Sequence, residues 1–178
     1  MPERRRSTLR FAAAIVAGLL ALAACRDSSG EGEWFAVKGK LFEFNYRLGI
    51  ATYVITLDAL QPFGEGNFAV VHFEDPAGGE PLELRQKLWP KLRHQTLTSP
   101  PLSCVVKDRP YAVDIRIEDS KGALLQRLAV TMTSNLDQSI LPDRPLVIGP
   151  VYELNPDMAG HPDGKLDSVE SAACPNRL

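Results

Sequence analysis

The sequence YAVDIRIEDSKGALLQRLAVTMT, residues 111–133, decides the fold class. Apolar and polar residues alternate on both sides of the polar run 119–122, which ends in glycine. Alternation with a period of two is the pattern of a half-buried strand, and a short polar, glycine-containing connection is typical of a hairpin. This stretch therefore predicts an antiparallel β-hairpin whose inward side chains are Tyr111, Val113, Ile115, Ile117, Leu128, Val130 and Met132.

Shorter strands are predicted on both sides of this hairpin. Residues 35–48 alternate but change phase near Gly39, which indicates a bulge or a turn. Residues 52–57 are rich in β-branched and aromatic side chains, and residues 68–73 are apolar on both faces, as expected of a central strand. Residues 146–148 lie between prolines, which suits a strand at a sheet edge.

Helical periodicity is scarce. Leu84, Leu88 and Leu92 are four residues apart, but Pro90 interrupts the run, so one or two helical turns are the most that it predicts. Many short strands without alternating helices predict a mainly β fold, an antiparallel β-sandwich of immunoglobulin-like or related topology with one short helical segment. A small β-barrel is the alternative.

The N-terminus carries a targeting pattern. Four arginines precede an apolar run of about thirteen residues, 11–23, which is the length of a signal-peptide core and too short to span a bilayer. The run ends in Leu22-Ala23-Ala24-Cys25, and this arrangement resembles the lipobox of bacterial lipoproteins. An ordinary secretory signal and a short membrane anchor are the alternatives.

The resemblance implies a domain organisation and a location. Residues 1–24 are expected to be a removable signal peptide, and Cys25 to carry a diacylglycerol and usually an N-terminal acyl chain such as palmitate. Residues 25–33 are expected to form a polar, flexible tether, and residues 34–178 a single periplasmic domain with an irregular tail from about residue 155. Arg26, in the position where aspartate signals inner-membrane retention, favours the outer membrane.

Charge excludes one class of partner. After removal of the signal peptide, 16 Lys and Arg face 21 Asp and Glu, a net charge of about −5. Nucleic-acid binding needs a concentrated basic face, so a nucleic-acid partner is not expected. Membrane attachment is expected through the acyl chains on Cys25.

Three cysteines are present, and acylation of Cys25 leaves Cys104 and Cys174. In the oxidising periplasm these two are predicted to form a disulfide, which would tie the tail to the body. Two buried thiols or a redox pair are the alternatives, although the sequence contains no Cys-x-x-Cys motif.

Signatures of catalysis and of cofactor binding are missing from the sequence. It contains no Gly-x-Ser-x-Gly elbow, phosphate loop or zinc-protease motif, so neither catalytic residues nor cofactors are predicted. Residues 159–170 share the spacing of a calcium loop, with Asp163, Asp167 and Glu170 as candidate ligands. Ala159 and His161 occupy the first and third ligand positions, so such a site would bind calcium feebly and no metal is expected.

One basic, aromatic stretch suggests recognition. Arginine and tryptophan are enriched at binding hot spots, and the stretch consists of Arg85, Lys87, Trp89, Lys91 and Arg93. An acidic protein, peptidoglycan carboxylates or anionic lipid would complement it. A solvated loop whose Trp89 packs on the sandwich is the alternative.

Together these patterns predict a membrane-anchored envelope lipoprotein, not an enzyme, whose β domain binds another envelope or exported protein. A periplasmic inhibitor or immunity protein that acts against a toxic or lytic enzyme is the alternative, and an envelope hydrolase comes third.

Overall fold

A computed structural model describes residues 32–166 and residue 174, and this part of the chain is mainly β. Seven strands build the body, and two short strands and two 3₁₀ turns follow them. The strands are β1 (Phe35–Asn45), β2 (Ile50–Ala59), β3 (Phe68–Phe73), β4 (Leu82–Lys87), β5 (His94–Thr98), β6 (Pro110–Glu118), β7 (Leu124–Thr133), β8 (Val147–Ile148) and β9 (Glu153–Leu154).

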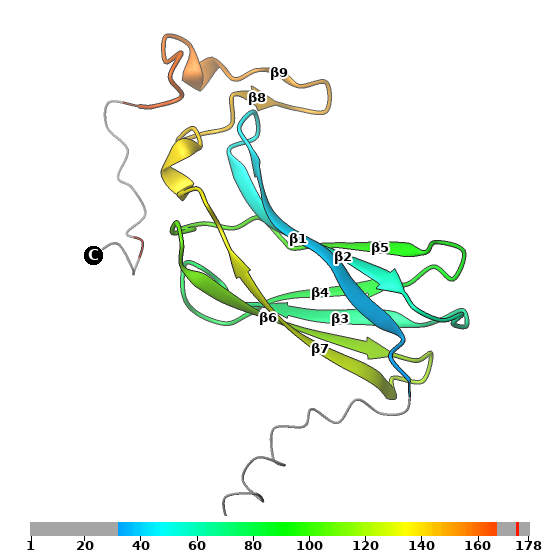
Figure 1. The fold of residues 1–178 in the computed structure, drawn as a ribbon. Coiled ribbons are helices and arrows are strands. Elements are labelled where there is room, and N and C mark those ends of the chain that lie inside the picture. The colour runs from blue at the N-terminus through cyan, green and yellow to red at the C-terminus, as the bar shows by residue number, and fades with distance from the viewer. Residues whose placement is uncertain (1–31, 167–173, 175–178) are drawn as a thin grey trace, which may run out of the picture. The chain divides into compact units, whose positions relative to one another are not determined.

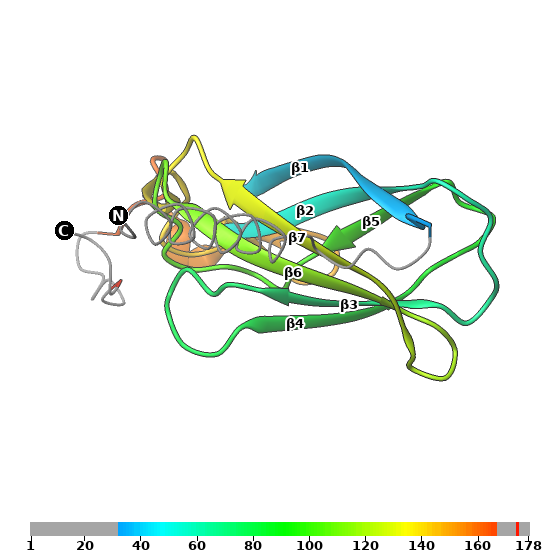
Figure 2. The same ribbon diagram turned by 60° about the horizontal axis from the view of Figure 1, so that its bottom comes forward.

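The seven long strands form two antiparallel sheets, in the orders β1-β2-β5 and β4-β3-β6-β7. Figures 1 and 2 show the sheets as two layers. This order is that of an immunoglobulin-like sandwich in which the fourth strand joins the sheet of the third, sixth and seventh. The sequence prediction of an antiparallel sandwich is confirmed, and the sheets do not close into a barrel.

Three predicted features appear in the strand pairing. β6 and β7 form the hairpin expected from residues 111–133, with Val113 opposite Val130 and Ile115 opposite Leu128. β3 lies between β4 and β6, as its apolar faces predict. The register of β1 shifts between Val37 and Gly39, so this glycine marks a bulge inside one strand and not a turn between two.

The predicted helical run is wrong at its beginning, because residues 82–87 form β4. In this strand Leu82, Leu84 and Gln86 are half-buried, whereas Glu83, Arg85 and Lys87 are exposed. The period-two pattern of polar residues therefore outweighs the four-residue leucine spacing. Helical turns occur instead as the 3₁₀ segments Gln138–Ile140 and Pro156–Met158.

Aromatic rings fill the core between the sheets. Tyr53 stacks on Phe73 with 5.5 Å between ring centroids, and Tyr111 meets Tyr53 edge-on at 6.2 Å. The hydroxyl of Tyr53 donates to the carbonyl of Glu74 at 3.0 Å, and burial raises the pKa of Tyr53 above its ordinary value. The Tyr111 hydroxyl accepts from the N–H of Val106 at 2.8 Å. A buried tyrosine at the start of the sixth strand that bonds upstream backbone is the tyrosine corner of immunoglobulin-like sandwiches.

Side chains bridge the two sheets along their open sides. The Gln126 side chain on β7 accepts from the N–H groups of Trp34 and Phe35 and donates to the carbonyl of Phe35. The Lys40 ammonium on β1 donates to the Thr131 carbonyl, and on the other side Gln86 on β4 donates to the Thr96 carbonyl on β5. These contacts hold the layers together where no strand continues from one to the other.

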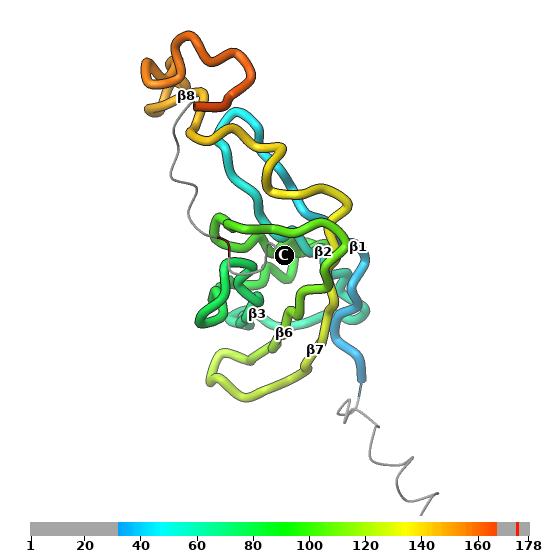
Figure 3. The backbone as a smooth tube through the Cα atoms, turned by 90° about the vertical axis from the view of Figure 1, so that its left-hand side faces the viewer, coloured from blue at the N-terminus to red at the C-terminus, as the bar shows by residue number. Residues whose placement is uncertain are grey.

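The segment after β7 returns to the turn between β1 and β2 (Figure 3). The N–H of Leu146 donates to the Arg47 carbonyl at 2.9 Å, and the Tyr46 hydroxyl donates to the Asp163 carbonyl at 3.1 Å. β8 is a strand as predicted, but it pairs only with β9 and not with the edge of a main sheet. Cys104 and Cys174 form the predicted disulfide, which joins residues 70 positions apart.

Candidate functional site

The outer face of the β4-β3-β6-β7 sheet gathers charged side chains from strands that are distant in sequence. Val70 on β3 lies opposite Arg85 on β4 and Arg116 on β6, and Arg116 in turn lies opposite Arg127 on β7. Because neighbouring strands are about 4.8 Å apart, the three arginines occupy one row of about 14 Å across the sheet. We call residues 85, 70, 116 and 127 the arginine row.

Carboxylates in the adjacent rows fix these arginines. Glu118 contacts Arg85 at 3.3 Å and Arg116 at 3.4 Å, while Arg127 donates through Nε to Asp114 at 2.6 Å. The Arg85 guanidinium also lies 4.2 Å from the centroid of the Phe68 ring. Pairing with carboxylates and stacking on a ring restrict the rotamers of long side chains, so less conformational entropy is lost when a partner binds.

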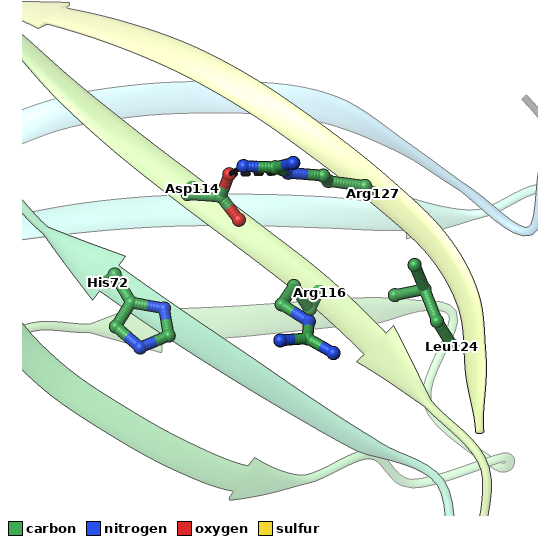
Figure 4. A pocket seen from close by; sticks show the side chains of 5 residues that line it. All are labelled: His72, Asp114, Arg116, Leu124 and Arg127. Carbon is green, nitrogen blue, oxygen red and sulfur yellow. Dashed lines mark hydrogen bonds and ion pairs between the residues drawn. The ribbon is translucent and has the colours of Figure 1, made fainter. Parts of the chain in front are cut away.

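A hollow of about 380 Å³ lies beside the row and is lined by His72, Asp114, Arg116, Leu124 and Arg127. Figure 4 shows the Asp114–Arg127 pair on one side of the hollow, with His72 and Arg116 on neighbouring strands. A second hollow of about 410 Å³ shares His72 and Asp114 and includes Ala112 and Ala129. The short side chains of these alanines, between longer neighbours, leave the surface low there.

His72 is the one histidine of this face. Its Nε2 atom lies 3.1 Å from Glu83 Oε1, within hydrogen-bond distance. No serine, threonine or cysteine is among the described residues that line the first hollow. Charged side chains on this face are paired with one another, an arrangement suited to recognition of complementary charged groups.

The structure divides the basic stretch predicted from the sequence. Arg85 and Lys87 lie on this face, whereas Trp89, Lys91 and Arg93 belong to the loop between β4 and β5. Arg93 makes two hydrogen bonds, of 3.0 and 3.2 Å, to the carboxylate of Asp58 on β2. Its guanidinium lowers the pKa of Asp58, and Asp58 raises the pKa of Arg93.

Sequence reasoning missed Arg116 and Arg127. The alternation along residues 111–118 puts Asp114 and Arg116 on the outer face, and this signal was available. The alternation could not show that Arg116 and Arg127 lie near Arg85, because the local pattern does not determine the strand order or the register.

The remaining predicted site residues are the lipidation cysteine and three candidate calcium ligands. Cys25, Asp167 and Glu170 lie outside the described residues. Asp163 is exposed, and its side chain accepts from the N–H of Lys165 at 3.1 Å. Within residues 32–166 and at residue 174, no group of three or more His, Cys, Asp or Glu side chains could hold a metal ion.

No helix in the described part of the chain is long and apolar enough to cross a bilayer. Comparison with known proteins gives no further assignment: no protein-family model matches this chain, and no curated protein sequence matches it.

Proposed function

We propose that this chain is a lipid-anchored lipoprotein of the bacterial cell envelope, on the periplasmic side of the outer membrane, whose β-sandwich binds another envelope or exported protein without catalysis. The lipobox-like residues 22–25 support the anchor. The Cys104–Cys174 disulfide fits an oxidising compartment such as the periplasm.

The arginine row carries the binding part of the proposal. Arg85, Arg116 and Arg127 lie in one row beside two hollows, and the Arg85 guanidinium stacks on the Phe68 ring. Arginine and aromatic side chains are enriched at protein interfaces, and guanidinium groups bind carboxylates in a bidentate geometry. Among the described residues, these three guanidinium groups pair with two carboxylates, Glu118 and Asp114, so the row keeps a net positive charge. The partner is therefore expected to present an acidic segment or surface to this face.

Site-specific cross-linking in the cell tests the proposal. A photoreactive phenylalanine analogue would replace Ala129, which is exposed beside the arginine row. The matched control carries the analogue at Thr96, which is exposed on β5 of the other sheet. We expect a discrete cross-linked envelope or exported protein from position 129 and none from position 96. No product at 129, or the same product from both positions, would contradict the proposal.

Charge reversal then identifies the contact. Arg116→Glu with Arg127→Glu should reduce the yield of the cross-link at least about tenfold, because like charges across an interface repel. Lys107→Glu with Arg144→Glu makes the same change in net charge on exposed loop residues and should leave the yield unchanged. A lytic or toxic enzyme as the cross-linked partner would assign the chain to the inhibitor class instead of an assembly role.

A further inference from the structure

Two loops at one end of the sandwich expose apolar side chains next to each other. Leu60, in the loop after β2, is 49% exposed, and Trp89 and Leu92, in the loop between β4 and β5, are 52% and 54% exposed. The N–H of Ala59 donates to the Arg93 carbonyl at 2.9 Å, which brings the loops together. We call Leu60, Trp89 and Leu92 the loop tip. A hollow of about 330 Å³ is lined by both loops and includes Leu60, Pro62, Phe63, Pro90 and Leu92.

The exposure of the loop tip is built into the fold. Gln95 is buried, and its side-chain amide accepts from the N–H of Trp89 and donates to the carbonyls of Trp89 and Leu92. Leu88, the residue before Trp89, is fully buried. These anchors hold the turn of residues 89–92 in one conformation, with Trp89 and Leu92 directed outward.

Cations border the loop tip. The Lys87 ammonium lies 4.6 Å from the centroid of the Trp89 ring, and Lys91 is exposed within the turn. Arg93 is neutralised by Asp58, so Lys87, at the end of β4, and Lys91, in the β4–β5 loop, provide the positive charge beside the loop tip. Tryptophan and leucine with lysine at the rim match the headgroup region of an anionic bilayer, where amphipathic rings and basic side chains both gain.

The chain enters the sandwich at this same end. The Leu60 N–H donates to the Trp34 carbonyl at 2.9 Å, and Gln61 donates to the Glu33 carbonyl at 3.3 Å. Figure 1 shows both loops at the end where β1 begins. Seven residue steps separate Cys25 from Gly32, and even a fully extended chain of that length reaches only about 25 Å.

From this placement we propose that the loop tip docks on the lipid surface to which Cys25 is anchored, with Trp89, Leu60 and Leu92 among the headgroups. The inference rests on the proposed lipid anchor. The short connection keeps the loop tip at a high effective concentration near the bilayer, so a patch too weak to bind membranes alone becomes occupied. Docking of this end would direct the opposite end of the sandwich, with β8 and β9, away from the membrane.

Tryptophan fluorescence tests the docking directly. The chain has two tryptophans, so Trp34→Phe leaves Trp89 as the sole reporter. The protein would be expressed from its full sequence, so that cells process and lipidate it. It would then be reconstituted into phosphatidylethanolamine–phosphatidylglycerol vesicles with bromine at defined acyl positions. We expect Trp89 to emit at a shorter wavelength in the vesicles than in buffer that contains neither vesicles nor detergent. We also expect bromines near the headgroup to quench this emission more strongly than bromines near the bilayer centre.

Matched variants separate docking from general stickiness. Leu60→Ser with Leu92→Ser should abolish most of the quenching. The control is Val151→Ser with Leu154→Ser, at positions that are 72% and 84% exposed in the β8–β9 hairpin. This pair should leave the quenching unchanged. Anchored protein whose Trp89 stays open to iodide and is not quenched by brominated lipid would overturn the docking alone. Protein without an acyl mass on Cys25 that fails to enter vesicles would overturn the anchor and the docking together.

Discussion

At the scale of single residues, Tyr111 links the core to the connection before β6. Its ring is fully buried against Tyr53, while its hydroxyl satisfies the backbone N–H of Val106. A backbone group near the core without a partner is costly, so one hydroxyl fixes the path of the chain between the two sheets.

Removal of that hydroxyl should therefore be measurable. Tyr111→Phe keeps the ring but leaves the Val106 N–H without its acceptor, and we expect the free energy of unfolding to fall by about 1–2 kcal/mol. Urea denaturation measures the change. Tyr152→Phe, at an exposed tyrosine of the C-terminal segment, is the control and should have no effect. Equal stabilities of all three proteins would show that the Tyr111 hydroxyl does not stabilise the fold.

At the scale of secondary-structure elements, the β6–β7 hairpin depends on its turn. The Asp119 carboxylate accepts from the N–H groups of Lys121 and Ala123, each at 2.8 Å, and Gly122 adopts a φ of 83° that favours glycine. The N–H of Ala123, and then that of Lys121, lower the pKa of Asp119. The turn is thus most stable with the carboxylate charged.

The sign of the pH effect follows from this pKa. Because the native pKa of Asp119 lies below that of the unfolded chain, its stabilising contribution is complete above about pH 4 and is lost as the pH falls through the native pKa. Asp119→Asn cannot titrate, so its melting temperature should be lower than that of the natural protein at neutral pH, and the difference should narrow in acid. Thermal unfolding followed by circular dichroism measures both. Ser120→Ala, in the same turn, should give a difference that does not vary with pH.

The elements that the sequence predicts correctly are those with a long, regular pattern of apolar and polar residues. Residues 111–133 contain two alternating strands around a turn, so the hairpin is unambiguous. In residues 82–92 a six-residue strand precedes Pro90, and Leu84 and Leu88 fit either period. The arginine row combines residues from four strands, and only the observed pairing reveals it. Arg93 and Arg85 looked like one patch in the sequence, but the chain crosses from one sheet to the other between them.

At the scale of the whole molecule, the disulfide joins the segment after β7 to the sandwich. Cys104 precedes β6, and Cys174 comes from the end of the chain. A cross-link that closes a loop of this size reduces the entropy of the unfolded chain, whereas the contacts of Tyr46 and Arg47 hold the same segment in the folded state.

Loss of the cross-link should lower stability without loss of the sandwich. For Cys104→Ser with Cys174→Ser we expect a decrease of up to about 4 kcal/mol in the free energy of unfolding, with the far-ultraviolet β signal retained. Guanidinium denaturation measures the decrease. Reductant should destabilise the natural protein by a similar amount and leave the double variant unchanged. A double variant as stable as the oxidised protein would show that the bond adds nothing to the fold.

The bonds between the sheets also bear on aggregation of the protein. They are made by Gln126, Gln86 and Lys40. Open strand edges can pair with the edges of neighbouring chains and so lead to aggregation. Here side-chain amides and an ammonium already occupy backbone groups of β1, β5 and β7. A second copy would first have to displace these bonds, so we expect the folded protein to resist edge-to-edge polymerisation at high concentration.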